Sequence, residues 1–384
     1  MAKPVKIEAE FGGKNSFVDI TTAVTSIVVI RGRTDYTEQF SPGVAQVEAL
    51  NYDGELDPDN TGGSYYGEIL IGRRIRITSN ADSLIYAQRI FEGAITDYTL
   101  NYDVSGTTTV SITCADGLAE LAQRSIDDAA VSAELTGARV TSILGLSDVN
   151  YTGTTNISTG YSTCAAGTAS GNALSYLHQV SITEQGALFV NRNGVLRFLD
   201  RYELLSGPVE TFSDDGSDIN YEQVERLLTQ TELYNQLEAN RASAAAVIRN
   251  DTTSQTTYGI RLLDLGLVFF ATDAEVTDML DYAMVRYANT SPRIAKVTTL
   301  LDDKLDADVA QLCQLELTDS VVVEFTPPNS TAITLDCIIE SIAHYYTVGA
   351  GWRATFGFSP RDTSNYLVLD DATLGRLDYN VLAF

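Results

Sequence analysis

The chain has 384 residues, of which 51 are acidic and 25 basic, so its formal net charge is −26. A protein with this charge repels DNA and RNA, which argues against a nucleic-acid-binding role. No apolar run approaches the roughly 18 residues of a membrane-spanning helix. The length predicts two or three domains. The first residues, MAKPVKIEAEF, lack the apolar core of a secretory signal, so we expect assembly in a cytoplasm.

The N-terminal residues 1–124 read as a β-module. Apolar and polar residues alternate, and β-branched residues are frequent, in four predicted strands at 25–33, 44–50, 73–79 and 108–114. Asp53-Gly54 predicts a type I′ hairpin turn, since both central residues of that turn need positive φ. A short helix is predicted at 116–124.

Residues 125–235 predict a mixed α+β middle region. The stretch 150–171 is dense in Gly, Ser and Thr and predicts a long surface loop. A helix is predicted at 172–186, with Asn172 as its N-cap. Asn193-Gly194 lies between two apolar runs and predicts a β-hairpin.

A second β-module is predicted for residues 236–360, including a helix at 273–290. Thr272 and Glu275 have the spacing of a capping box at the start of that helix. Strands follow the helix, and residues 361–384 are expected to form a C-terminal arm.

The two ends of the chain resemble each other. The segments 72–116 and 320–360 carry strands in the same order, and an alignment without gaps places Ile75 opposite Val323 and Glu92 opposite Glu340. This internal similarity predicts two related β-modules around the α+β middle.

The order of the motifs resembles a known family. The N-terminal run combines a strand, an R-G-R, a second strand leading to N-x-D-G, and a D-P-D-N loop; it is followed in order by FEGAITDY, DGLAELAQR, ALFVNRNGVLRF and IESIAHYYTVGAGWRATFGFSP. Together these resemble the minor tail proteins of siphophages, the phages with long non-contractile tails. The resemblance covers about residue 20 to residue 384. That family is similar to the baseplate hub proteins of contractile tails.

The resemblance implies a fold and a function. The expected fold is mainly β, with two tube-like β-barrel modules flanking or enclosing an α+β region. Three chains would form a homotrimeric ring of six barrels on which a hexameric tail tube can sit. The implied role is a structural hub at the tail tip of the virion, part of the DNA ejection channel. The implied partners are the distal tail protein, the tape measure protein, and tail fibre or other tip proteins.

The acidic charge has two interpretations. It keeps a large surface soluble, or it lines a channel through which DNA slides without binding. The second interpretation predicts that many acidic side chains face the channel.

The segment Asp57–Glu68, DPDNTGGSYYGE, has the spacing of a calcium-binding EF-hand loop. An EF-hand needs helices on both sides, whereas the flanking sequences predict strands. Pro58 and Ser64 also depart from the EF-hand pattern. We therefore interpret this segment as a turn and expect no metal site.

Few residues are candidates for catalysis or metal binding. Of the two histidines, His178 falls in a predicted helix and His344 in a predicted strand, and packing roles are favoured for both. Four widely spaced cysteines, Cys114, Cys164, Cys313 and Cys337, lack the close pairs of zinc or redox sites and predict buried free thiols.

We therefore expect no catalytic set and no cofactor. Trp352 and the paired tyrosines Tyr65-Tyr66 and Tyr345-Tyr346 suit a core or a subunit interface, or a sugar-binding platform. Two alternatives to the hub follow: a distal adaptor that binds a host glycan, and a cell-wall hydrolase.

Overall fold

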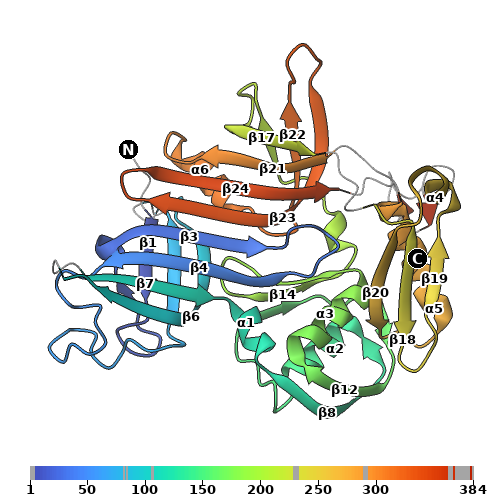
Figure 1. Ribbon diagram of the computed structural model, residues 1–384, viewed down its shortest axis with the longest axis horizontal. Helices are drawn as coiled ribbons and strands as arrows, with labels where there is room; N and C mark the ends of the chain where they lie inside the picture. The colour runs from blue at the N-terminus through green and yellow to red at the C-terminus, as the bar shows by residue number, and fades with distance from the viewer. Residues whose placement is uncertain are drawn as a thin grey trace.

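The computed structural model describes residues 5–80, 83, 85–104, 108–227, 233–288, 293–361, 366–367 and 381–382. Most strands belong to one 14-stranded sheet that runs through both ends of the chain (Figure 1). The mainly β class with an α+β middle is confirmed. Among the described residues, no helix is both long and apolar enough to cross a membrane.

The N-terminal module contains seven strands in the hydrogen-bonded order β3-β4-β7-β6-β5-β1-β2. Every second residue is buried along β1 and β5 and most of β4, which is why the alternating sequence predicts these strands. The elements are β1 (Val5–Ala9), β2 (Val18–Asp19), η1 (Thr21–Ala23), β3 (Val24–Gly32), β4 (Ser41–Leu50), β5 (Arg74–Ser79), β6 (Gln88–Tyr102) and β7 (Thr108–Ala115).

The C-terminal part of the chain builds a second module. Its antiparallel strands follow the order β17-β21-β24-β23-β22, and β15 and β16 extend this order in parallel. The elements are β15 (Glu210–Ser213), β16 (Ile219–Asn220), β17 (Gln223–Leu227), β21 (Arg293–Leu300), α6 (Asp306–Gln314), β22 (Ser320–Phe325), β23 (Ile333–Thr347) and β24 (Gly351–Pro360).

The two modules repeat one topology. In chain order and in space, β3, β4, β5, β6 and β7 correspond to β17, β21, β22, β23 and β24. Both β6 and β23 have 15 residues, and each carries a bulge against the strand that follows it. The bulged residue is Thr96 in the first module and Glu340 in the second. The two related modules predicted from the sequence are present.

The predicted alignment of the modules is wrong in detail. Because the bulges correspond, Thr96 rather than Glu92 is the equivalent of Glu340, a difference of four residues along the strand. The sequence alignment placed two acidic residues opposite each other. The hydrogen-bond register, by contrast, is set by the position of the bulge in each strand.

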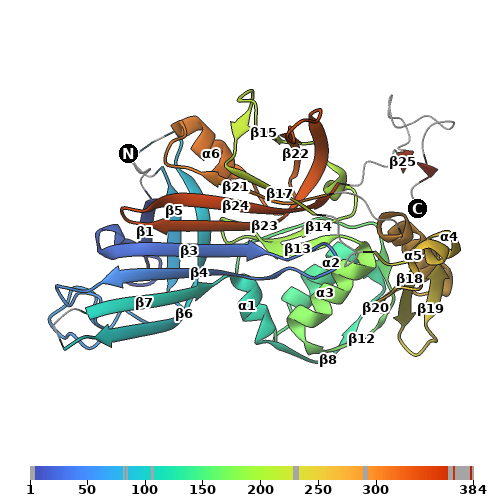
Figure 2. The ribbon, with the colours of Figure 1, turned by 45° about the horizontal axis from the view of Figure 1, so that its top comes forward.

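A seam between β3 and β23 joins the modules into one sheet. Residues Ser341–Thr347 pair antiparallel with residues Ser26–Gly32 in an uninterrupted register. The result is a continuous antiparallel sheet of eight strands, β17-β21-β24-β23-β3-β4-β7-β6. Both ribbon views show β23 beside β3, red against blue (Figures 1 and 2).

Buried charges reinforce this seam. Arg33 Nε lies 2.6 Å from the carboxylate of Glu340, which is only 1% exposed, and the Ser359 hydroxyl donates to the same carboxylate. The Arg31 guanidinium lies 2.5 Å from Glu316. Gly32 has φ +111°, and a Cβ there would lie 2.1 Å from the Glu340 carbonyl oxygen, so the seam requires glycine.

The middle region packs its helices and small sheets against the N-terminal module. Phe189 contacts Phe40 at a ring-centroid distance of 5.3 Å, which connects the two cores. The elements are α1 (Gly117–Ala122), β8 (Ser125–Val131), β9 (Glu134–Leu135), α2 (Thr136–Leu144), β10 (Thr155–Ile157), β11 (Thr163–Cys164), β12 (Gly167–Asn172), α3 (Ala173–Glu184), β13 (Ala187–Val190), β14 (Leu196–Leu199) and η2 (Glu203–Leu205).

Several local predictions for the middle region are confirmed. The Asn172 side chain caps α3 by accepting from Ser175 N, and the short helix predicted at 116–124 is present as α1. The hairpin of β13 and β14 turns at Gly194. The predicted loop at 150–171 is wrong in part, since it contains β10, β11 and most of β12.

The Asp53-Gly54 hairpin is also wrong. β4 ends at Leu50 and the next strand starts at Arg74, so the segment between them is a long excursion of turns. Only Gly54 of the pair has positive φ, and β4 pairs with β3 and β7 rather than with β5. A turn signal predicts a local bend but cannot specify the partner strand.

Residues 236–287 form a separate small unit between β17 and β21. Its three-stranded sheet packs on α5 around a core of its own. The elements are β18 (Gln236–Arg241), β19 (Val247–Asn250), α4 (Thr252–Tyr258), β20 (Leu262–Val268) and α5 (Asp273–Tyr287). The capping box of Thr272 and Glu275 is confirmed.

The four domain boundaries stay a prediction. The hydrogen-bond pairing places β15, β16 and β17 with the second module, although they precede residue 236. Most of the expected C-terminal arm, 361–384, lies outside the described residues, apart from the short strands β25 (Tyr366–Leu367) and β26 (Val381–Leu382).

The thiols and imidazoles lie inside the fold. All four cysteines are buried and free, as predicted. His344 is buried beside Trp352 in the second module, and His178 is half-buried on α3. Burial, together with the smaller effect of the positive charge of Arg31, lowers the pKa of His344 to about 3. Burial also lowers the pKa of His178, to about 4.

The seam charges predict a large effect on stability. We expect Glu340→Ala to lower the free energy of unfolding by about 3–5 kcal/mol, because it leaves Arg33 unpaired beside the core. The matched control is Glu120→Ala, which removes the exposed pair with Arg124 and should cost less than about 1 kcal/mol. Equal effects in urea denaturation would contradict a buried seam.

The histidine pKa values predict acid sensitivity. His344 stays neutral in the folded state, whereas the unfolded chain takes up a proton on this residue as the pH falls below about 6.5. Proton uptake stabilises the unfolded chain, so the free energy of unfolding decreases toward acid pH. Between about pH 8 and pH 5, His344→Gln should lose about 2 kcal/mol less stability than the natural chain. Urea denaturation at several pH values measures this difference, and parallel pH profiles would contradict it.

Candidate assembly and channel surface

The eight-stranded sheet has one face on the core and the other exposed. Directly opposed residues in antiparallel strands share a face, so the register can be followed across the modules. One row of the exposed face consists of Asp97, Thr113, Gln46, Val28, Tyr345 and Arg353. The alternate residues, such as Val47, Ile112 and Phe356, are buried in the core.

Hydroxyl and amide groups cover much of this exposed face. Ser111 and Gln46 both donate to the Glu48 carboxylate, at 2.7 and 2.9 Å. In the other module, the hydroxyls of Thr298 and Thr355 are 3.2 Å apart across two strands. These hydrogen bonds lie within and across strands and make this part of the face polar.

Apolar side chains interrupt this surface near the seam. Ile30 is 50% exposed and Tyr345 is 43% exposed, and both belong to strands that form the seam.

The charges on this face nearly balance. Glu48, Asp97 and Glu225 are acidic, and Lys296 and Arg353 are basic. The Lys296 ammonium lies 2.9 Å from the Glu225 carboxylate. The expected concentration of acids is therefore not found on this face, and the acidic excess of the chain is carried by other surfaces.

In the described part of the chain, the eight-stranded sheet ends in two unpaired edges. Within the described residues, Asp97–Tyr102 of β6 pairs only with β7, and β17 pairs only with β21. The corresponding part of β23, Ser341–Thr347, is paired on both sides. Tyr102, at the free edge of β6, is 65% exposed. Such edges favour pairing with a further strand.

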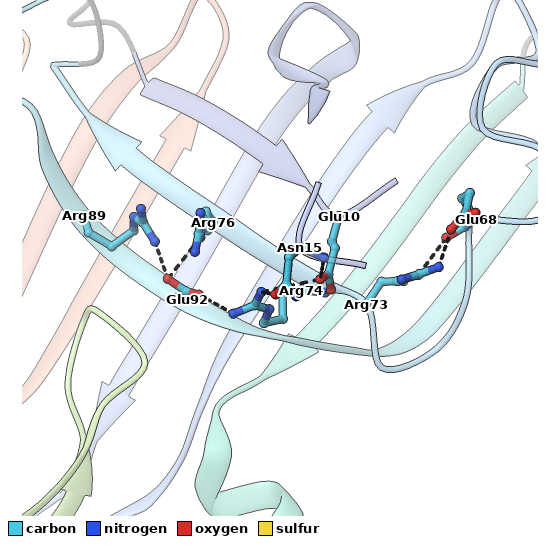
Figure 3. A network of polar contacts seen from close by, with 8 residues as sticks. All are labelled: Glu10, Asn15, Glu68, Arg73, Arg74, Arg76, Arg89 and Glu92. Carbon is cyan, nitrogen blue, oxygen red and sulfur yellow. Dashed lines mark hydrogen bonds and ion pairs between the residues drawn. The ribbon is translucent and has the colours of Figure 1, made fainter. Parts of the chain in front are cut away.

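A second polar cluster lies on the outer strands of the N-terminal module (Figure 3). Arg74 Nη2 donates to Asn15 Oδ1 at 2.6 Å, and Arg76 Nε lies 3.2 Å from Glu92. The cluster as a whole comprises Glu10, Asn15, Glu68, Arg73, Arg74, Arg76, Arg89 and Glu92.

This cluster clamps the turn after β1 onto β5. Burial raises the pKa of Glu10, but hydrogen bonds from the backbone of Asn15 and Arg74 and the Arg74 charge outweigh it and lower the pKa below its ordinary value. Each carboxylate of the cluster is bound by arginine. The arrangement stabilises charged carboxylates, which suits a structural role rather than proton transfer.

The calcium-like segment connects strands, as predicted. β4 precedes it and β5 follows it. Asp57 accepts hydrogen bonds from Asp59 N and from the Tyr102 hydroxyl, at 2.9 and 2.8 Å, while Glu68 pairs with Arg73. Within the described residues, no group of three or more His, Cys, Asp or Glu side chains could hold a metal ion.

The aromatic candidates divide between core and surface. Trp352 is fully buried, so the interpretations as a sugar platform or a subunit contact are wrong for this residue. Its position on the core face of β24 determines this burial. Tyr66 and Tyr345 are exposed and stay candidates for subunit contacts.

Comparisons with known proteins give structural but not sequence relatives. No protein-family model and no curated protein sequence matches the chain. The 43 kDa tail protein of prophage MuSo2 from Shewanella oneidensis is similar, with a TM-score of 0.61 and 14% identity over 94% of this chain and 98% of that chain.

Two other solved structures agree with this. A tail protein from Neisseria meningitidis has a TM-score of 0.61 and 10% identity, over 92% of this chain and 96% of that chain. A prophage tail protein from Listeria monocytogenes has a TM-score of 0.54 and 13% identity, over 94% and 96%. The chain shares the fold of these phage tail proteins, and closure of its two modules into barrels stays a prediction.

Proposed function

We propose that this chain is a structural component of a bacteriophage tail tip. It forms a hub ring that connects the tail tube to distal host-binding proteins and lines part of the DNA ejection channel. The observation that carries the proposal is the repeated module within a fold shared, over nearly the full length of both chains, with phage tail proteins. The sequence resemblance points to a siphophage tail, assembled in the host cytoplasm.

Symmetry supports a ring of three copies. Each chain contributes two modules of the same topology, so a homotrimer presents six similar modules. A hexameric tail tube can contact such a ring without a mismatch of symmetry. The distal tail protein, the tape measure protein and the fibres are the partners that this position implies.

The exposed face of the eight-stranded sheet suits the channel. Hydroxyl groups on it bond to the Glu48 carboxylate or to each other, and its charges nearly balance. DNA binds proteins chiefly through phosphate contacts with clustered Lys and Arg. A face without such a cluster lets DNA pass, and this role requires no catalysis.

Location in the virion tests the proposal. We expect mass spectrometry of purified virions to find the chain at three copies per particle, and immunogold labelling to mark the tail tip. Labelling at the head or along the tube, or absence from virions, would overturn the hub assignment.

Substitution in the channel face tests the channel role. We expect Gln46→Arg with Thr298→Arg, one change per module, to add six positive charges to a three-copy ring and create DNA binding. If six phosphates are contacted, that affinity should fall by about three orders of magnitude between about 50 and 200 mM salt. Filter binding at several salt concentrations measures it.

The matched control adds the same charge elsewhere. Thr252→Arg with Thr256→Arg places the new arginines on the exposed helix α4 of the small unit. Equal DNA binding by the two double variants would show that the channel face has no special access to DNA.

A further inference from the structure

We propose that copies of this chain join edge to edge, with β17 of one copy pairing antiparallel with Asp97–Tyr102 of β6 in the next copy. This inference rests on the proposed function, because it assumes that the partner is a second copy of the chain. The new elements are the two strand edges that meet and the register in which they pair.

The seam inside the chain is the template for this contact. β23 uses the first half of one edge to pair with β22 and the second half to pair with β3. β6 uses the first half of the equivalent edge to pair with β5, and its second half is unpaired within the described residues. The strand equivalent to β3 is β17, and in the part of the chain that the structure describes one edge of β17 is unpaired.

The two unpaired edges are therefore the two halves of a seam that the chain already forms once. They lie at opposite ends of the eight-stranded sheet, so one chain cannot join them to each other without closing that sheet on itself. A second copy supplies the missing strand at each end. Repetition of the contact around a ring covers both of these edges, which removes their tendency to aggregate.

The repeat also specifies the register. Asn101 corresponds to Tyr345, because Thr96 corresponds to Glu340. Glu225 corresponds to Val28, because each occupies the same position when directly opposed residues are followed across the strands of its module. Val28 pairs with Tyr345 at the existing seam. We therefore place Glu225 of one copy opposite Asn101 of the next.

The neighbouring pair fits this register chemically. At the seam inside the chain, Tyr346 is directly opposite Ile27. Their equivalents are Tyr102 and Val224, again a tyrosine and a β-branched residue. Aromatic and β-branched side chains form favourable cross-strand pairs. The contact would also cover Tyr102, which is 65% exposed in the single chain.

Disulfide cross-linking between two variants tests the contact. A mixture of Asn101→Cys and Glu225→Cys chains, oxidised after assembly, should form a covalent dimer, because directly opposed strand residues have Cα separations within the range that a disulfide spans. We expect at least about ten-fold more dimer in the mixture than in either variant alone. The four natural cysteines are buried and contribute little background.

Two controls define the result. Val28→Cys with Tyr345→Cys in one chain should form a disulfide at the existing seam and run as a monomer on a gel. A mixture of Thr99→Cys and Gln223→Cys, off the inferred register, should cross-link poorly. Stronger linking by this second mixture would overturn the register.

The outcomes separate this inference from the proposed function. Absence of the Asn101–Glu225 cross-link, while the seam control links, overturns the edge contact even if the chain is found at the tail tip. A cross-link in a chain that is missing from virions supports the contact and overturns the hub assignment.

Discussion

The rest of the structure depends on the pairing of β3 with β23. Without it, the two modules would be separate sheets joined by the middle region. With it, eight strands form one antiparallel sheet whose register continues from one module to the other. Gly32 lets the backbones approach, and the buried Arg33–Glu340 pair makes misalignment costly, because a shift would leave a charge unpaired in the core.

Internal repetition gives one chain two equivalent but distinct modules. The first module is followed by the α+β middle, and the second contains the small unit inserted between β17 and β21. Insertions at these positions leave the eight-stranded sheet intact, because they occur at connections rather than within strands. The eight-stranded sheet is thus common to both modules, whereas the segments attached to each module differ.

Charge is distributed unevenly over the surfaces of the protein. The chain is strongly acidic, yet the exposed sheet face carries acids beside bases, as in the Lys296–Glu225 pair. The arginines of the cluster on β5 and β6 are paired with Glu10 and Glu92. The net charge of this protein therefore does not predict the charge of any single surface. Solubility depends on the total charge, whereas the passage of a charged molecule depends on the electrostatic potential near the surface that it passes.

Local sequence determined much of the secondary structure. The caps Asn172 and Thr272, the turn at Gly194 and the alternation of the long strands could be predicted because each depends on near neighbours. The order of motifs and the internal similarity also indicated the tail-protein fold and its two modules.

Only the tertiary structure decided which strands pair and in what register. The equivalence of Thr96 and Glu340, the seam and the free edges depend on contacts between residues far apart in the sequence, and so does the burial of Trp352. A strand pattern specifies which face of a strand is buried, whereas the partner is chosen by the packing of the whole sheet.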